Sequence, residues 1–441
     1  MPNMRFLQLT LLLVSLAASH GFAQETLTLQ AALEKGLKYN FQIRIANEQS
    51  EIAARNNNLM EAGLLPSLTF SANQAYNLND VDNPASFIKG KFNTESFRVA
   101  GDINWNLFRG MSVWITKEQL ALLHQQSDEN ATMVVENTLQ GISLAYLNAL
   151  AQEKQMEASK TSMEISRDNY KRTNMRKNLG AAGTFELLQA ENGLLQDSTA
   201  YLRQQATYNQ AVRNLQLLIG DTANTNIVLT DLAEETFPLL SKQDLKKDLF
   251  ENNTNLRQQY LNVQLAENSI KQNRVGLFPT ISTSAGINQS TNTLKFPDVP
   301  ATTGGQDNYY IQFALSYNLF NNLKVQRAIK NAKQNAVIAE LTTEELKLNL
   351  SHELENQYEQ YNARLILKDL NKTMINNATL QLDMAADRLK SGAIDSFDFR
   401  QIQVNYLNAN AQYYLAVFQT MESYLELLKL SGNLLQETPS N

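Results

Sequence analysis

The chain contains 441 residues, carries a formal net charge of −6 and has no cysteine. Without cysteine it has neither a disulfide framework nor thiol chemistry, and its mild acidity excludes the basic surface stripe of a nucleic-acid-binding protein. We therefore expect no nucleic acid partner and a fold that is stabilised by packing or by assembly of copies.

Residues 1–23 have the pattern of a secretory signal peptide. Arg5 precedes an apolar run at 6–18, and the small residues Gly21 and Ala23 precede the expected cleavage site. The apolar run is too short to span a bilayer, and no later stretch reaches the roughly 18 apolar residues that a membrane helix needs. The sequence thus predicts an exported protein without a membrane-spanning helix.

Landmarks in the remaining chain recur at an offset of 212 or 213 positions. The motif GLLP at 63–66, for example, returns as GLFP at 276–279. Because the order of the landmarks is preserved, the sequence predicts an internal duplication. The two structural halves are expected at 24–240 and 241–432, with a C-terminal tail at 433–441.

Both halves predict the same series of elements: a short helix, a medium helix, two strands, a very long helix and a returning helix. In the first half the helices at 29–64 are a short one at 29–37 and a longer one at 41–64, and the later elements are expected at 67–78, 97–108, 112–179 and 184–219. In the second half they are expected at 242–276, 280–289, 309–320, 324–391 and 396–430. The long helices contain no proline and carry apolar residues seven apart, which is typical of a coiled coil.

The strands alternate apolar and polar residues over ten to twelve positions, as transmembrane β-barrel strands do. A soluble sheet with two unlike faces remains an alternative, because alternation alone is a weak signal. The two loops between paired strands, 79–96 and 290–308, have surface-loop composition. In the barrel interpretation, the polar side chains that face the lumen are Asn73, Asn77, Arg98, Asp102, Asn104, Gln312, Ser316 and Asn318.

Four strands cannot close a barrel, and an open sheet edge cannot lie in lipid. Strands from several copies must therefore share one barrel. Edge chemistry alone does not determine the number of copies.

Several motifs resemble the TolC family of outer-membrane efflux proteins. They are the opening LTLQAALEKGLKYNFQIRIA, the GLLP and GLFP strand entries, and the two turns LGAAGTFELLQA and SGAIDSFDFRQI. The resemblance implies an α+β membrane protein, a homotrimer with a 12-stranded transmembrane β-barrel continuous with a periplasmic α-helical coiled-coil barrel. It also implies an exit duct of the outer membrane of a Gram-negative bacterium.

The family resemblance further implies a periplasmic adaptor protein and, through it, an inner-membrane RND or ABC pump. The sequence leaves the cargo and the energy source of that pump open. Docking of the adaptor is expected at the two helical tips, at Leu179, Gly180, Ala181, Ser391, Gly392 and Ala393.

Acidic residues follow both turns. Thr184 and Ser396 suit helix N-caps, which would place Glu186 and Asp398 in the first turn of each returning helix. The helix dipole alone accounts for a carboxylate there. In a threefold assembly, however, three copies of Asp398 would form a ring that attracts cations.

The family's second turn carries a polar latch of Tyr, Arg and Asp, and this sequence has Leu389, Ile394 and Gln401 at those places. We therefore expect a periplasmic gate that closes by packing of Leu389 and Ile394, with a constriction formed by Leu389, Ile394 and Asp398. Asp395 adds a charge there. The complete set of candidate gate residues is Leu389, Ile394, Asp395, Asp398, Gln401 and Glu186.

Two other classes of protein remain as alternatives. An exported hydrolase finds little support, because His124 and His352 are not at corresponding positions and no metal spacing, nucleophile elbow or phosphate loop occurs. We expect no cofactor, no metal and no catalytic residue. A periplasmic coiled-coil scaffold or adaptor without a channel would explain the helices but not the four strands.

Overall fold

The computed structural model describes residues 25–83, 85, 87–221, 227–230 and 237–437, so the predicted signal peptide lies outside the described residues. The chain divides into two compact units. The helical unit comprises Met1–Glu48, Asn130–Arg257 and Glu345–Asn441, and the sheet unit comprises Gln49–Glu129 and Gln258–Glu344. Among the described residues, no helix is both long and apolar enough to cross a membrane.

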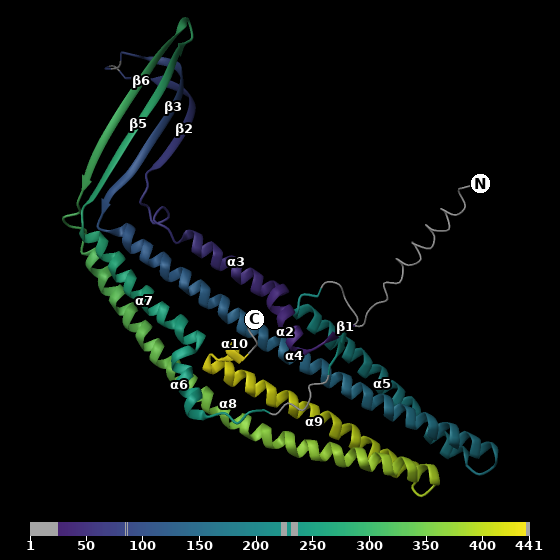
Figure 1. Ribbon diagram of the computed structural model, residues 1–441. Coiled ribbons are helices and arrows are strands. Elements are labelled where there is room, and N and C mark those ends of the chain that lie inside the picture. Colours follow the sequence, from purple (N-terminus) through teal and green to yellow (C-terminus); the bar gives the residue numbers. More distant parts are fainter. Residues whose placement is uncertain (1–24, 84, 86, 222–226, 231–236, 438–441) are drawn as a thin grey trace, which may run out of the picture. The chain divides into compact units, whose positions relative to one another are not determined.

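Two shorter helices, two strands, a long helix and a returning helix follow one another in both halves of the chain (Figure 1). In the first half they are β1 (Glu25–Leu27), α2 (Leu29–Tyr39), α3 (Phe41–Asn56), β2 (Ser67–Val81), β3 (Gly90–Arg109), α4 (Ser112–Asn178), α5 (Thr184–Leu218) and β4 (Ile227–Leu229). In the second half they are α6 (Lys242–Asn252), α7 (Thr254–Arg274), the 3₁₀ turn η1 (Val275–Leu277), β5 (Thr280–Phe296), β6 (Val299–Ser316), α8 (Lys324–Ser391), α9 (Ser396–Ser431) and α10 (Leu434–Glu437).

The long helices α4 and α8 contain 67 and 68 residues. At about 1.5 Å per residue, each extends roughly 100 Å. α5 returns along α4, and α9 returns along α8, which makes two helical hairpins. We call α4–α5 the first hairpin and α8–α9 the second hairpin.

In each half an asparagine separates the short helix from the medium helix that follows it, within the expected helical segments 29–64 and 242–276. Asn40 separates α2 from α3, and Asn253 separates α6 from α7. Both asparagines have extended backbone conformations, with ψ of 128° and 123°. An asparagine side chain that bonds to nearby backbone groups competes with the helical hydrogen bonds and so favours such a break.

The two asparagine side chains make the same pair of contacts. Each Oδ1 accepts a hydrogen bond from a backbone N–H of the helix that follows, at 3.2 Å for Asn40 and 3.0 Å for Asn253. Each Nδ2 donates to the end of a returning helix, to Leu218 O at 2.7 Å and to Leu430 O at 3.0 Å. The breaks therefore tie the medium helices to the last turns of α5 and α9.

The first medium helix also ends earlier than expected. After α3 ends at Asn56, Asn58 Nδ2 donates to Arg55 O at 2.7 Å, and Asn58 Oδ1 accepts from Glu61 N at 2.9 Å. These contacts form a turn within the predicted helix, before the proline that was expected to end it.

The strands are longer than the sequence predicts. The four-stranded antiparallel sheet has the order β2-β3-β5-β6, and its strands contain 15, 20, 17 and 18 residues. Much of the expected loops at 79–96 and 290–308 is therefore strand, because backbone pairing continues through polar residues after the apolar alternation stops. β6 ends at Ser316, so the expected strand over 309–320 is too long at its end.

The helical unit encloses its own hydrophobic cores. One core surrounds Tyr146 and Leu215, and another surrounds Leu354 and Tyr361; all four side chains are fully buried. The short parallel pair of β1 and β4, which the sequence analysis did not expect, lies against the first core. Tyr146 Oη donates to the backbone oxygens of Leu27 and Thr230, each at 2.8 Å, and so ties that pair to α4.

Candidate functional site: the two-faced sheet and the hairpin tips

The register of the sheet places the predicted lumen residues on one face. Asn73 pairs with Arg98, and Asn104 pairs through β5 with Gln312. Strand parity then places the rest of the expected set on the same face, except one residue. The residues sharing this polar face are Asn73, Asn77, Arg98, Asp102, Asn104, Gln312 and Ser316. Asn318 lies beyond the end of β6, so its expected place in a lumen-facing strand is wrong.

The sequence analysis missed Tyr310 on the polar face. Its Oη donates to Asp102 Oδ1 at 2.6 Å. The residue between them in the ladder is Gly286, where an added Cβ would lie 2.6 Å from Asp102 Oδ1 and 2.9 Å from the Tyr310 ring. A glycine is therefore required for this contact across β5. The alternation of side chains along β6 already placed Tyr310 on the polar face, because it lies two residues before Gln312.

The opposite face of the sheet is apolar and exposed. Leu68 is 78% exposed, Phe70 75%, Ile311 68% and Phe313 69%. A soluble protein rarely exposes such large contiguous apolar side chains. The face therefore suits contact with lipid, whereas the polar face suits contact with water.

The tips of both hairpins are built around a left-handed glycine. Gly180 has φ of +75° and Gly392 has φ of +76°, and both are open to solvent. The next backbone N–H, that of Ala181 or of Ala393, donates back to the end of the long helix at 2.8 Å. This is the hydrogen-bonding pattern of a helix that ends in a glycine cap, and it reverses the chain.

The expected N-caps Thr184 and Ser396 are wrong, because both residues lie inside the helices that they were expected to cap. α9 is capped by Asp395, whose Oδ1 accepts from Phe397 N at 2.9 Å and Asp398 N at 2.8 Å. α5 begins after Gly183, which offers no side-chain cap. A carboxylate at the helix N-terminus is also favoured by the helix dipole, so Asp395 stabilises the turn directly.

The predicted gate residues differ in how far their side chains are exposed to solvent. Leu389 and Ile394 are half-buried against the core of the second hairpin, formed by Leu382, Ala385 and Phe399. By contrast, Glu186 and Asp398 are exposed in the first turns of α5 and α9. Gln401 is also exposed, and its Nε2 donates to Asn405 Oδ1 at 3.2 Å.

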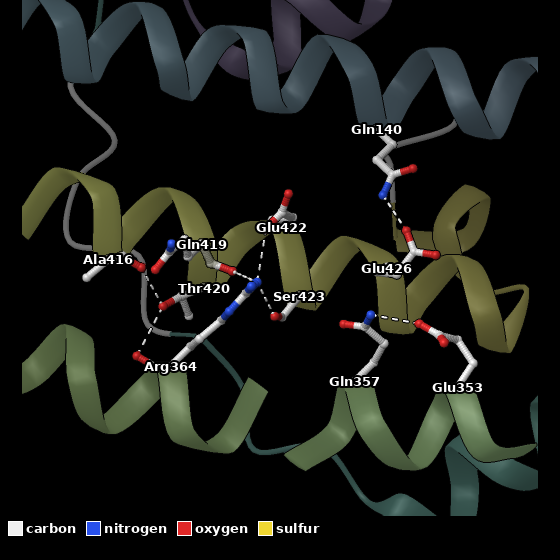
Figure 2. A network of polar contacts seen from close by, with 10 residues as sticks. All are labelled: Gln140, Glu353, Gln357, Arg364, Ala416, Gln419, Thr420, Glu422, Ser423 and Glu426. Carbon is white, nitrogen blue, oxygen red and sulfur yellow. Dashed lines mark hydrogen bonds and ion pairs between the residues drawn. The ribbon is translucent and has the colours of Figure 1, made fainter. Parts of the chain in front are cut away.

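A polar network farther along α9 joins it to α8 and α4 (Figure 2). Arg364 of α8 donates to Gln419 O at 2.7 Å and Ser423 Oγ at 2.6 Å, and it forms an ion pair with Glu422 at 3.1 Å. Gln140 of α4 donates to Glu426 Oε2 at 2.7 Å. Sequence reasoning missed this network, because these residues do not follow the apolar spacing of seven.

Comparisons with known proteins agree with this architecture. The sequence model of the family described as outer membrane efflux protein matches residues 32–221 and 245–433. Nodulation protein T of Rhizobium leguminosarum bv. trifolii is 21% identical over 388 residues, which cover 85% of this chain and 79% of that protein.

Solved outer-membrane channels have the same fold. The CmeC outer membrane channel of Campylobacter jejuni matches with a TM-score of 0.71 and 15% identity, covering 92% of this chain and 86% of that one. The open state of the MtrE outer membrane channel of Neisseria gonorrhoeae matches with a TM-score of 0.65 and 17% identity, covering 93% and 91%.

The family match covers most of both halves, so the chain belongs to the outer membrane efflux proteins. It is accordingly a protein of the outer membrane with a periplasmic helical part, and a passive conduit rather than an enzyme. Among the residues that the structure describes, no three acidic or histidine side chains gather to hold a metal ion.

Proposed function

We propose that this chain is one subunit of a homotrimeric outer-membrane exit duct. The observation that carries the proposal is the four-stranded sheet, which has one apolar face, one polar face and two unpaired edges, β2 and β6. Unpaired backbone groups are strongly disfavoured in lipid, so β6 of one copy must pair with β2 of the next. Three copies supply twelve strands, the number that the family resemblance implies.

In this assembly the polar face lines the lumen. Arg98 and Asp102 place charges of both signs on that face, together with the amides of Asn73, Asn104 and Gln312. Such a lining keeps the lumen hydrated, because most positions on this face present a hydrogen-bonding side chain to water. The duct would pass soluble cargo without bond chemistry.

The hairpin tips are the proposed docking surface for a periplasmic adaptor, which links the duct to an inner-membrane RND or ABC pump. Leu179 is 84% exposed beside Gly180. The second tip presents Ser391, Gly392 and Ala393, which are all exposed. Small and exposed residues at both tips allow a partner to approach the backbone closely.

The same tips carry the proposed periplasmic gate, with a division of roles between its residues. Leu389 and Ile394 hold the second hairpin together from within, and Asp395 caps α9. The exposed carboxylates Asp398 and Glu186 are then the groups available to a lumen. Rings of them favour cations over anions at the constriction.

The test is single-channel conductance of the detergent-purified protein in a planar bilayer. We expect stable, cation-preferring channels from the wild type and a weaker cation preference from Asp398→Asn. The control is Asp387→Asn, which removes an exposed carboxylate that already pairs with Lys390 at 3.0 Å.

Equal loss of selectivity in both variants would show that Asp398 has no special place in the constriction. If Asp398→Asn leaves ion selectivity unchanged, the carboxylate of Asp398 only stabilises α9 by interacting with the helix dipole. The absence of any channel from the wild type would count against the duct itself.

A further inference from the structure

The polar face of the sheet becomes apolar at one end. The turns between β2 and β3 and between β5 and β6 lie at that end, whereas the opposite strand ends connect to helices (Figure 1). Because the helical part of the protein is periplasmic, these turns mark the outer end of the proposed duct. Strand parity places five apolar side chains near the turns on the otherwise polar face, and we call them the outer collar: Val81, Phe92, Leu294, Phe296 and Val299.

The side chains of the outer collar are gathered by specific local geometry. The rings of Phe92 and Phe296 pack with their centroids 5.4 Å apart, and both side chains are half-buried in the single chain. A register shift between β5 and β6 places Val299 opposite Phe296, where an unshifted ladder would place Pro300. β-Bulges of this kind redirect side chains at the rims of barrels. The bulge therefore brings Val299 onto the same face as the two rings.

The opposite face of the sheet changes in the reverse sense. Nearer the helices it carries Leu68 and other large apolar side chains, but at the outer end it carries the charged residues Asp80, Lys91, Glu95 and Lys295. Lys91 pairs with Asp80 at 4.0 Å, and Lys295 pairs with Glu95 at 2.5 Å. Charged side chains are disfavoured against lipid, so this part of the sheet lies outside the hydrocarbon.

The lengths of the strands agree with that placement. β3 contains 20 residues, whereas a strand needs only roughly 9–11 residues to cross a bilayer. The outer part of the sheet thus has charged residues facing outward and apolar residues facing inward. This is the pattern of a water-soluble barrel, in which apolar side chains approach one another in the interior because they avoid water there.

We propose that the outer collar narrows the outer mouth of the duct to an apolar constriction, with Phe92 and Phe296 as residues that determine cargo specificity. This inference rests on the proposed trimeric duct, in which each copy contributes one collar to the ring. A hydrated ion is hindered at an apolar ring, because it would have to lose water there. An aromatic solute can instead pack against the phenyl rings. The collar therefore favours apolar and aromatic cargo over strongly hydrated cargo of similar size.

Cysteine labelling of intact cells tests the constriction, because the natural chain has no cysteine. Gln306→Cys places a thiol on the polar face, farther from the turns than the collar, and Asn93→Cys places one beside Phe92 on the opposite face. Both wild-type residues are exposed in the single chain. Each variant is treated from outside with N-ethylmaleimide, which is small, or with a maleimide on a long polyethylene glycol chain.

We expect N-ethylmaleimide to label both cysteines and the long reagent to label Gln306→Cys several-fold more slowly than Asn93→Cys. Adding Phe92→Asn and Phe296→Asn should remove most of that difference by accelerating only Gln306→Cys. Val299→Asn is a milder change, since this side chain is 58% exposed, and should act in the same direction if the double variant does not assemble.

Equal labelling of the two cysteines by the long reagent, with the collar intact, would overturn the inference. Failure of N-ethylmaleimide to reach Gln306→Cys in protein that has inserted into the outer membrane would have a different meaning. It would show that no water-filled lumen exists, and would therefore refute the proposed duct and the collar with it.

A second measurement addresses specificity. In planar bilayers, the permeability of phenyltrimethylammonium is compared with that of tetraethylammonium, which has the same charge and a similar size but no ring. We expect the wild type to favour the aromatic cation and Phe92→Asn/Phe296→Asn to lose that preference several-fold. Leu78→Asn is the matched control, because it removes an 89% exposed apolar side chain from the opposite face at the same end. An equal permeability ratio in wild type and double variant, both assembled as trimers, would overturn the role of the two rings.

Discussion

The sheet exposes its large apolar side chains, whereas the helical unit buries them. In the sheet, Leu68 and Phe313 are 78% and 69% exposed, and two edges lack partners in the chain. In the helical unit, Tyr146 and Leu215 are both 0% exposed. One chain therefore completes a core among its helices, whereas its sheet leaves an apolar face and two edges uncovered.

The largest expected effect comes from a substitution at Gly432, where the end of α9 closely approaches α6. Gly432 has φ of +73°, and an added Cβ would lie 2.4 Å from Asn252 O. We expect Gly432→Ala to lower the free energy of unfolding by more than about 3 kcal/mol, because backbone strain adds to the overlap. The yield of folded protein and its thermal unfolding temperature measure this effect.

Gly392 provides the matched control. Its φ is +76°, yet nothing lies within 4 Å of an added Cβ. Gly392→Ala should lower the free energy of unfolding by only about 1–2 kcal/mol, the strain of a left-handed alanine. Equal losses in the two variants would contradict a close approach of Gly432 to α6.

The next effect concerns the two faces of the sheet. Phe313 lies on the apolar face and Gln312, its neighbour in β6, lies on the polar face. We expect Phe313→Lys to destabilise the membrane-inserted form by about 2–4 kcal/mol, because a lysine would then face lipid. Gln312→Lys should insert normally and alter only ion selectivity. Heat-resistant trimer in outer-membrane fractions measures insertion, and similar yields for both variants would contradict the assigned faces.

A smaller loss of stability is expected where the short strands β1 and β4 pack against the first hydrophobic core. Tyr146→Phe removes the hydroxyl that bonds the backbone oxygens of Leu27 and Thr230 but keeps the buried ring. Leu27 O still accepts from the backbone N–H and Oγ1 of Thr230, so we expect a loss of about 1 kcal/mol in the free energy of unfolding, the net value of one hydrogen bond. Denaturant titration of the purified protein checks this value, and an unchanged midpoint would show that these oxygens find another donor.

The smallest effect is a pH dependence on the alkaline side. Burial, together with the negative charge of the neighbouring Glu153, raises the pKa of Tyr208 from its ordinary value of 10.0 to about 12. The stability that comes from keeping this hydroxyl protonated is complete below pH 10 and is lost as the pH rises toward 12, since only the unfolded chain loses the proton there.

Tyr208→Phe should therefore flatten the decline of the unfolding temperature between pH 10 and pH 12. A decline of the same slope in wild type and Tyr208→Phe would show that other groups cause it.

Much of the architecture follows from patterns in the sequence. The expected returning helix at 184–219 differs by one residue from α5, because the turn glycine Gly180 and the heptads around it are local signals. The expected end of the first medium helix at 64 was wrong. The side chain of Asn58, which bonds to the backbone on both sides, outweighed helix periodicity there.

The candidate gate shows where sequence reasoning stopped. It identified the exposed carboxylate Asp398 but treated Asp395 as a further gate charge, although this side chain caps α9. Its placement of Leu389 in a constriction stays a prediction, and in the single chain this half-buried side chain packs beside Phe399 of its own hairpin. Periodicity cannot separate these roles, because a residue on one side of a helix can face either a partner helix or a pore.

The sequence by itself determined the periods of two and of seven, the two halves and the turn residues, because these depend on contacts between residues close in the chain. Only the tertiary structure decided which polar residues meet. Asp197 of α5 forms an ion pair with Arg400 of α9, 203 positions away, and no local pattern marks either of them as a partner of the other. The pair exists because these helices pack there, and burial makes the Asp197 carboxylate require a partner.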